Sequence, residues 1–318
     1  MALVLPDKWV WDCWFAFDGE KHHIFYLHAS KALGDPDRRH RNVMVGHAVS
    51  NDLTNWTIVR DALAVGPSPS FDSYTTWTGS VVKDDAGLWW MFYTGTSRED
   101  GGDIQSIGAA TSKDLMVWEK LGNEALLKAD PSWYETFELP EATAEHCRDP
   151  WVFRSPGNPD WQMLFTSRAN HGRFRERGIV GYATSPDLRK WTIQPPLSSP
   201  DQGFHELEVL QFANVDGVPL LIFSCYWTNI TESRLADVGK VGLTYSVVVN
   251  EDLTNIDITK AKPFKSHPLY ASRLVQDQGG DWFLVGFVDM VEGEFGGYLP
   301  DPVPVTADAI LGLIPKLN

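Results

Sequence analysis

Cysteine and long apolar runs are both scarce in this chain of 318 residues. The cysteines Cys13, Cys147 and Cys225 are widely spaced and form no CxxC pair, which argues against a disulfide framework or a zinc site and indicates reduced thiols. No apolar run approaches 18 residues, and the N-terminus has no basic segment before an apolar stretch. We therefore expect no membrane span, no signal peptide and a cytoplasmic location.

Positive charge is also in deficit, because 27 basic residues face 42 acidic residues and leave a formal net charge of −15. Such a field repels the phosphates of nucleic acids and anionic lipid surfaces, so neither is an expected partner. A small neutral ligand is the easier one to bind. The hydrophobic content of 43% and the charged content of 22% are ordinary for a globular protein.

Helical periodicity is weak, and short apolar-aromatic runs recur instead. They occupy residues 22–30, 88–96, 161–169, 219–227 and 281–289, and the aligned centres of these runs lie 58 to 73 residues apart. Turn signals such as "DDAG" precede several of them. The recurrence predicts five similar units, each with a buried strand at a fixed place.

A second motif follows the first at a similar offset. It reads "GHAVSNDLTNW" at 46–56, "GAATSKDLMVW" at 108–118 and "GYATSPDLRKW" at 181–191, with a degenerate copy at 243–256. The pattern predicts a strand of small residues, an Asp-Leu turn and a further strand. Five four-stranded units form a five-bladed β-propeller, so we predict an all-β, single-domain protein over residues 1–318. A pair of β-sandwiches is the alternative, and only the tail 306–318 has a mildly helical pattern.

Three acidic residues occupy the same phase of the repeat. Asp12, Asp149 and Glu208 precede the aligned centres of the aromatic runs of their units by 13 to 16 residues, which places each on the innermost strand of its blade. Because innermost strands surround one central channel, the three carboxylates are expected to converge there. Converging carboxylates without histidines at metal-ligand spacing suit glycoside hydrolysis, and we expect no metal and no cofactor. Each acid alone would more often be a turn or capping residue.

Several short motifs resemble those of the invertase and levansucrase group, glycoside hydrolase families 32 and 68. "VWDCW" at 10–14 resembles the Trp-Asp-Ser-Trp nucleophile segment of family 68, and "RDP" at 148–150 resembles a motif shared by both families. "WTGSVV" at 77–82, "WMFYTG" at 90–95 and "GHAVSNDLTNW" are similar to segments of family 32. The motifs occur in order over most of residues 9–290, and the resemblance again implies a five-bladed propeller.

The resemblance also implies roles for individual residues. Asp12 would be the nucleophile that attacks a fructofuranosyl unit, and Glu208 would be the acid/base. Asp149 would bind two ring hydroxyls, with Arg148 beside it. Trp14, Trp77 and Ser80 would line the sugar pocket. The family retains configuration, which implies about 5–5.5 Å between the carboxyl groups of Asp12 and Glu208.

This chain departs from the family pattern at some positions. It has Glu208-Val209-Leu210 where family 32 has Glu-Cys-Pro, and Glu206 lies two residues earlier on the same strand face, so Glu206 is a rival acid/base. Tyr270 opens the innermost strand of the last blade and is a further candidate for contact with substrate. His146 and His205 flank motif acids and could line the pocket. The C-terminal β-sandwich of family 32 has no counterpart in this sequence.

Three functions are open at this point. The favoured one is a retaining fructosidase acting on sucrose or a short fructo-oligosaccharide, with fructosyl transfer as a variant on the same site. The second is an inverting arabinofuranosidase or xylosidase of the family 43 type, whose carboxyl groups would lie about 6.5–9.5 Å apart. The third is a propeller that binds sugar without catalysis.

Overall fold

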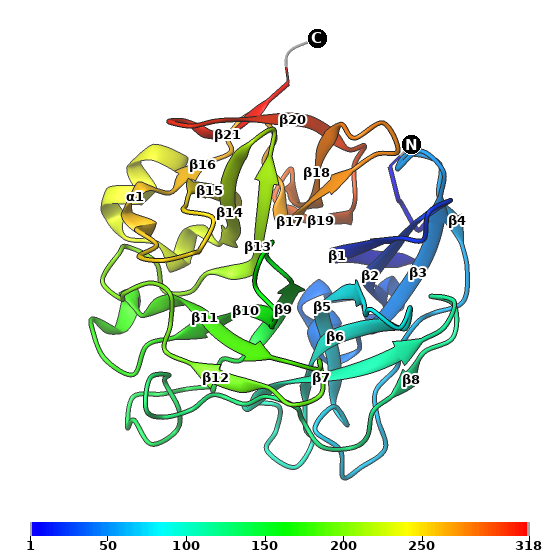
Figure 1. The fold of residues 1–318 in the computed structure, drawn as a ribbon, viewed down its shortest axis with the longest axis horizontal. Helices are drawn as coiled ribbons and strands as arrows, with labels where there is room; N and C mark the ends of the chain where they lie inside the picture. Colours follow the sequence, from blue (N-terminus) through cyan, green and yellow to red (C-terminus); the bar gives the residue numbers. More distant parts are fainter. Residues whose placement is uncertain (1, 317–318) are drawn as a thin grey trace.

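The computed structural model describes residues 2–316, and nearly all of its regular structure is strand. The strands form five antiparallel sheets (Figure 1). The first sheet holds β1 (Lys8–Phe17), β2 (His22–Ser30), β3 (Met44–Ser50) and β4 (Thr57–Ile58); the second holds β5 (Thr75–Lys83), β6 (Trp89–Thr96), β7 (Gln105–Ser112) and β8 (Glu119–Lys120). The third holds β9 (Arg148–Phe153), β10 (Trp161–Arg168), β11 (Gly178–Ser185) and β12 (Thr192–Gln194); the fourth holds β13 (Glu208–Val215), β14 (Val218–Cys225), β15 (Leu243–Val248) and β16 (Lys262–Pro263). The fifth holds β17 (Tyr270–Gln276), β18 (Trp282–Val291), β20 (Val303–Asp308) and β21 (Gly312–Pro315), and β19 (Glu294–Tyr298) pairs with β18.

The sheets follow one another around a central axis in chain order (Figure 1). The first strand of each sheet contacts the first strand of the next: β1 contacts β5, β5 contacts β9, β9 contacts β13, β13 contacts β17, and β17 closes the ring on β1. This arrangement is a five-bladed β-propeller, as the sequence predicts. The five apolar-aromatic runs are the second strands β2, β6, β10, β14 and β18 of the blades.

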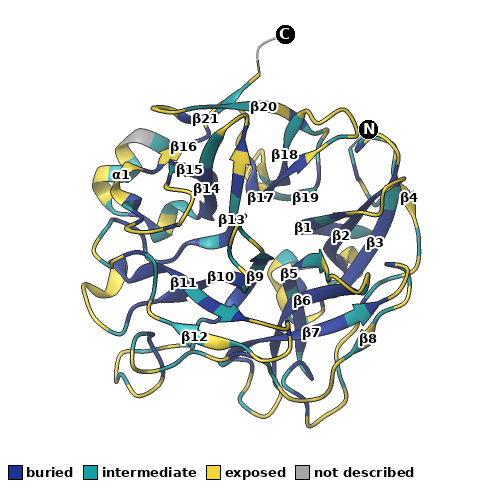
Figure 2. Cartoon of the chain, viewed as in Figure 1, coloured by how far each residue is buried: buried dark blue, intermediate teal, exposed yellow. Residues whose placement is uncertain are grey.

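The second strands are buried because each blade packs against a neighbour on both faces (Figure 2). All eight residues of β6 and all eight of β10 are buried, and only the last residue of β2 is exposed. A strand covered on both sides has no solvent face to supply alternate polar residues. This explains why these runs are almost continuously apolar.

The repeated Ser-x-Asp-Leu motif forms the same turn in the first three blades. In the first, the Asp52 carboxylate accepts the backbone N–H groups of Thr54 (2.9 Å) and Asn55 (2.7 Å), and Leu53 takes a left-handed φ of 61° with its side chain buried. The equivalents Leu115 and Leu188 have φ values of 62° and 63° and are also buried. Burial of the leucine side chain helps to offset the strain of its backbone.

The mildly helical pattern of the tail 306–318 does not correspond to a helix in residues 306–316, and residues 317–318 lie outside the described part of the chain. Strands β20 and β21 form a hairpin in which Val305 pairs with Pro315 and Asp308 pairs with Gly312. The Asp308 carboxylate accepts the N–H groups of the two turn residues Ile310 and Leu311, which are exposed. Pairing with β18 closes the last blade and overrides the weak helical pattern.

Helical structure is confined to short segments. These are α1 (Glu232–Val238) and the 3₁₀ turns η1 (Lys31–Leu33), η2 (Pro36–Arg41), η3 (Phe174–Glu176), η4 (Trp227–Asn229) and η5 (Ile258–Lys260). Within residues 2–316, none of the helices has the length and apolar character needed to cross a bilayer.

Candidate active site

A cavity of about 690 Å³ opens at one end of the central channel. Its inner part, here called the floor, is lined by residues of the first strands, namely Trp11, Asp12, Trp77, Thr78, Arg148, Asp149, Glu208, Val209 and Tyr270, with Glu206 just before β13. Its outer part, here called the rim, is lined by loop residues, which include Asp37, Arg39 and His40 of η2, Tyr226 and Asn229 after β14, and Asp289, Glu294 and Phe295 around the β18–β19 turn.

Every first strand is irregular at the level of the floor. The register with the second strand shifts between Val10 and Cys13 in β1, between Trp77 and Gly79 in β5, and between Glu208 and Gln211 in β13. Similar shifts occur at Asp149 in β9 and between Tyr270 and Arg273 in β17. A β-bulge re-aims the side chains beside it, and here it brings consecutive residues such as Trp11 and Asp12 to the same cavity.

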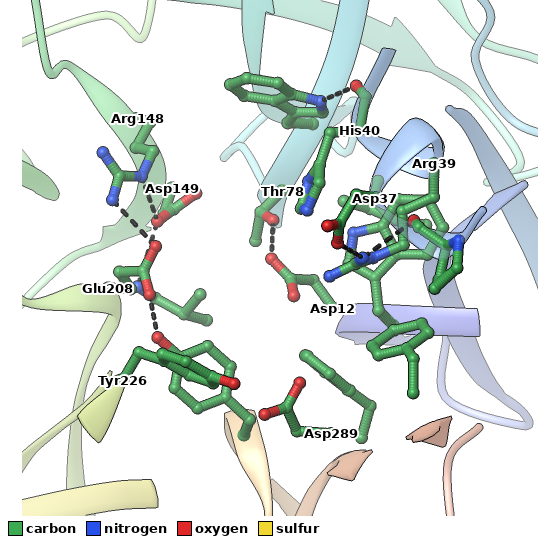
Figure 3. Close-up of a pocket in the computed structure, with 18 of the residues that line it drawn as sticks. Asp12, Asp37, Arg39, His40, Thr78, Arg148, Asp149, Glu208, Tyr226 and Asp289 are labelled. Atoms are coloured by element: carbon green, nitrogen blue, oxygen red, sulfur yellow. Dashed lines mark hydrogen bonds and ion pairs between the residues drawn. The ribbon is translucent and has the colours of Figure 1, made fainter. Parts of the chain in front are cut away.

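Asp12 lies within the bulge of β1 and is directed into the cavity (Figure 3). Its Oδ2 accepts a hydrogen bond from the Thr78 hydroxyl. Burial, with the neighbouring Asp149 charge, raises the pKa of Asp12 to about 6, although the Thr78 hydrogen bond opposes the rise. Asp12 therefore stays largely ionised at pH 7 and can act as a nucleophile.

Asp149 is buried on β9 with a left-handed φ of 55°. Its Oδ2 accepts the Thr166 hydroxyl (3.0 Å) and the Val209 N–H (3.2 Å), and the Nε of Arg148 lies 3.4 Å away. Burial raises the pKa of Asp149, and the Arg148 guanidinium opposes that rise. The bonds fix the carboxyl group at one side of the cavity.

Glu208 lines the cavity from β13 (Figure 3). Its Oε1 accepts Nη2 of Arg148 at 2.9 Å, and its Oε2 accepts the Tyr270 hydroxyl. Burial raises the pKa of Glu208, and the charge of Glu206 raises it further. A carboxyl group with a raised pKa holds a proton near neutral pH and suits the role of a general acid.

Glu206 has a different environment. Its Oε2 accepts Nη2 of Arg148, and its Oε1 accepts the side-chain amide of Asn229 at 2.8 Å. Although burial raises the pKa of Glu206, the charge of Arg148 outweighs burial and lowers it below its usual range. Glu206 is therefore held as an anion that balances Arg148.

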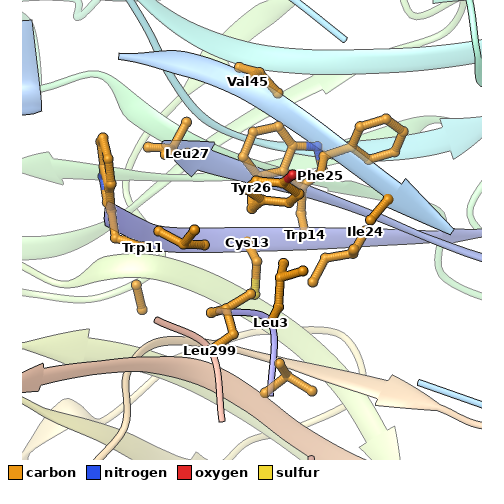
Figure 4. Close-up of a cluster of buried hydrophobic side chains, with 14 of the residues drawn as sticks. Leu3, Trp11, Cys13, Trp14, Ile24, Phe25, Tyr26, Leu27, Val45 and Leu299 are labelled. Carbon is orange, nitrogen blue, oxygen red and sulfur yellow. The ribbon is translucent and has the colours of Figure 1, made fainter. Parts of the chain in front are cut away.

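Two expected pocket residues lie elsewhere. Trp14 is fully buried in a hydrophobic cluster and stacks on Phe25, with ring centroids 6.1 Å apart (Figure 4). Ser80 is buried, and its Oγ accepts the N–H of Val152 at 3.1 Å. Regular alternation would have put Trp14 on the face of Asp12, but the bulges in β1 and β5 break the alternation. The cavity is lined by Trp11 and Thr78 instead.

The other expected residues except His205 line the cavity, as do several residues that the sequence did not indicate. Trp77 donates its indole N–H to the carbonyl of His40 at 2.9 Å and so ties the rim to the floor. His146 lines the cavity, whereas His205 does not. Thr78, Arg39, His40 and Asp289 were missed. Thr78 stands within the quoted motif WTGSVV, and Asp289 ends the recurring run 281–289, but none of the other four runs ends in an acidic residue that would have marked this place.

Arg273 is a missed residue beneath the floor. Its guanidinium donates to the carbonyls of Val209 (3.3 Å) and Gly79 (3.3 Å) and so links the bulges of β13 and β5. Its charge also lowers the pKa values of Asp12 and Asp149 against the effect of burial. Within the described part of the chain, no group of three or more His, Cys, Asp or Glu side chains could hold a metal ion.

The sequence model described as glycosyl hydrolases family 32 N-terminal domain matches residues 12–298. The chain belongs to glycosyl hydrolase family 32. This match confirms the resemblance to family 32 that the sequence motifs indicated.

Similar proteins agree with this assignment. The chain is 29% identical to the sucrose-6-phosphate hydrolase of Bacillus subtilis over 87% of this chain and 54% of that protein. It is 33% identical to the bifunctional 6(G)-fructosyltransferase/2,1-fructan:2,1-fructan 1-fructosyltransferase of Allium cepa over 92% of this chain and 40% of that protein. The chain thus spans about half the length of the curated relatives it matches. The structure of an inulosucrase from Halalkalicoccus jeotgali bound to kestose shares the fold, with a TM-score of 0.72, 21% identity and coverage of 99% of this chain and 92% of that chain.

Proposed function

We propose that this family 32 chain is a retaining β-fructofuranosidase that removes a terminal fructosyl unit from sucrose or a short fructo-oligosaccharide. The observation that carries the proposal is the convergence of Asp12, Asp149 and Glu208 from three blades on one cavity. Family membership supports the enzyme class. The three buried free cysteines support a reducing compartment such as the cytoplasm.

In the first step, an ionised oxygen of Asp12 attacks the anomeric carbon of the fructosyl ring, and the bond to the glycosidic oxygen breaks. Glu208 gives its proton to that oxygen, and the leaving sugar departs as a neutral alcohol. In the second step, a water molecule attacks the same carbon, gives its proton to Glu208 and releases Asp12. Two inversions at one carbon retain its configuration.

The remaining floor residues have supporting roles in this proposal. The fixed carboxyl group of Asp149 accepts hydrogen bonds from two ring hydroxyls and stabilises positive charge that develops on the sugar ring. Arg148 holds Glu206 as an anion, so that Glu208 is the group that can carry a proton near neutral pH. We therefore assign the acid/base role to Glu208.

Fructosyl transfer is the second candidate, because the Allium cepa relative is named a fructosyltransferase. Transfer uses the same first step and differs only in whether water or a sugar hydroxyl accepts the fructosyl group. The name of the Bacillus subtilis relative adds a second question, which is whether the leaving sugar carries a phosphate.

The test is incubation of the purified chain with sucrose, kestose and an aryl arabinofuranoside, beside an Asp12→Asn variant. We expect fructose release from sucrose or kestose, no reaction with the arabinofuranoside, and a loss on the order of 10⁴-fold in Asp12→Asn. Longer oligosaccharides without free fructose would indicate transfer. Full activity of Asp12→Asn, or cleavage of the arabinofuranoside alone, would exclude the proposal.

A further inference from the structure

The rim has an excess of acidic groups at the place where a leaving sugar would lie. Glu208 protonates the bond that breaks, so the part of the substrate beyond that bond points outward from the floor to the rim. The carboxyl groups of Asp37, Asp289 and Glu294 line this outer part. Among the described residues that line the rim, Arg39 is the only arginine or lysine. A leaving sugar with a negative charge would therefore approach three carboxyl groups.

Arg39 is already engaged by the protein. Its Nη1 donates to the Pro36 carbonyl at 2.9 Å and lies 3.5 Å from Asp37. Its guanidinium stacks at 3.9 Å from the ring centroid of Phe295 and 5.7 Å from that of Trp11. Arg39 is largely buried by these contacts. It braces the η2 turn against the β18–β19 turn, and its charge interacts with the carboxyl groups of Asp37, Asp12 and Asp289, which leaves little net positive charge for a phosphate.

The other basic side chains of the cavity provide little positive charge that could bind a phosphate group. Burial lowers the pKa values of His40 and His146 to about 3, with the nearby arginines as a further cause, so both rings are neutral at pH 7. Arg148 is a floor residue whose charge is balanced by the anionic Glu206 and which also donates a hydrogen bond to Glu208.

Asp289 is the rim carboxyl group that is best placed to act on a ligand. It lines the cavity at the end of β18, and Figure 3 shows its carboxyl group at the edge of the space that Tyr226 also borders. Its Oδ2 is shielded from water and has no hydrogen-bond partner among the described residues. Burial raises the pKa of Asp289, while the charge of Arg39 and a hydrogen bond with Tyr226 oppose that rise and favour the anionic form, which accepts hydroxyl groups and repels negative charge. Asp37, by contrast, is largely exposed and pairs with Arg39.

We propose that the rim is a subsite for a neutral, unphosphorylated leaving sugar, and that Asp289 determines this specificity by accepting sugar hydroxyls and repelling a phosphate. The inference rests on the proposed fructosidase function. Such a subsite would discriminate sucrose from sucrose-6-phosphate, whose phosphate is carried by the leaving glucosyl unit. Asp289 would then determine which substrate binds and would take no part in bond cleavage.

The test measures kcat and KM for sucrose, sucrose-6-phosphate and methyl β-D-fructofuranoside, whose leaving group is too small to reach the rim. We expect the unmodified chain to prefer sucrose over sucrose-6-phosphate by about 100-fold in kcat/KM. In Asp289→Asn we expect KM for sucrose to rise about 10-fold with kcat retained, because a charge-assisted hydrogen bond is weakened. The preference for sucrose should fall by at least about 10-fold, and both constants for the methyl fructoside should stay unchanged.

Glu292→Gln is the matched control, since it makes the same change of charge at the same turn in an exposed residue that does not line the cavity. Equal use of sucrose and sucrose-6-phosphate by the unmodified chain would overturn the inference. So would an Asp289→Asn variant that loses activity on the methyl fructoside as strongly as on sucrose, because that result indicates a structural role.

Failure of the proposed function would give a different result, in which the unmodified chain cleaves no fructoside at all. Calorimetric titration of the same protein with sucrose and with sucrose-6-phosphate then decides the rim inference on its own. Binding of sucrose alone supports it, whereas equal affinity for both sugars, or binding of neither, overturns it.

Discussion

The floor and the rim of the cavity are built from different parts of the fold. The floor comes from the first strands of all five blades, each with a bulge at the same level. Its charged groups are buried or half-buried, and Arg148 contacts the carboxyl groups of Asp149, Glu206 and Glu208. The rim comes from segments that follow second strands, namely η2, the segment after β14 and the β18–β19 turn, and the repeated sequence motifs do not extend into these connections. The repeated part of the fold thus holds the reacting groups, and the unrepeated part faces whatever is attached to the fructosyl unit.

The largest expected effect concerns the floor. Glu208→Gln keeps the shape of the side chain but removes the proton that the leaving oxygen needs, so kcat for sucrose should fall by about 10³-fold. A fructoside with a highly acidic leaving group should lose much less in the first step, because its leaving oxygen needs no proton. A steady-state comparison of the two substrates checks this, and equal losses on both would count against Glu208 as the acid.

The next effect separates the floor from the core beneath it. Trp14→Ala should reduce the free energy of unfolding by about 3–5 kcal/mol, because it leaves a cavity in the first blade's hydrophobic cluster. The protein that remains folded should keep its KM for sucrose. Trp11→Ala, a change of the same size in a side chain that lines the cavity, should raise KM. Chemical denaturation and steady-state kinetics on both variants test this prediction. A Trp14→Ala variant with a raised KM and normal stability would contradict the assignment of Trp14 to the core.

The smallest effect is a shift of the pH profile. Asp12 must be ionised, so activity should fall as the pH drops below about 6. Glu208 must be protonated, so activity should fall as the pH rises through its raised pKa. Glu206→Gln removes the anion that raises the pKa of Glu208, and the alkaline limb of kcat/KM should therefore move down by about one pH unit. The acid limb should stay in place. Loss of all activity would instead make Glu206 the acid/base.

The repeat in the sequence predicted most of the fold. The five second strands can be recognised in the sequence because a strand covered on both faces must be apolar. The Ser-x-Asp-Leu turn can be recognised because the same residue types recur. The same phase argument located Asp12, Asp149 and Glu208. The tail hairpin was missed because its pairing with β18 depends on tertiary contact that a local pattern does not contain.

The bulges account for the errors in the site. A bulge is a shift in register between two strands and has no fixed residue type. The resemblance of the motifs placed Trp14 and Ser80 at the pocket and did not indicate Thr78, because a motif does not show which side chains a bulge turns toward the channel. The rim was missed for another reason. Arg39 lies in η2, outside the repeated motifs, and Asp289 ends a recurring run whose other copies have no acidic residue there. The two residues come from the first and fifth blades, which meet only where the ring closes through β17 and β1.

The central claim is that Asp12 and Glu208 act as nucleophile and acid/base in a retaining reaction, and the configuration of a transfer product tests it most directly. Sucrose is incubated with the enzyme in dilute methanol, and the methyl fructofuranoside formed at early times is identified by NMR. With Asp12 as the nucleophile, the product is methyl β-D-fructofuranoside, which results from two inversions at the anomeric carbon. Formation of the α-anomer would show a single inversion and would contradict the assignment of Asp12 as the nucleophile.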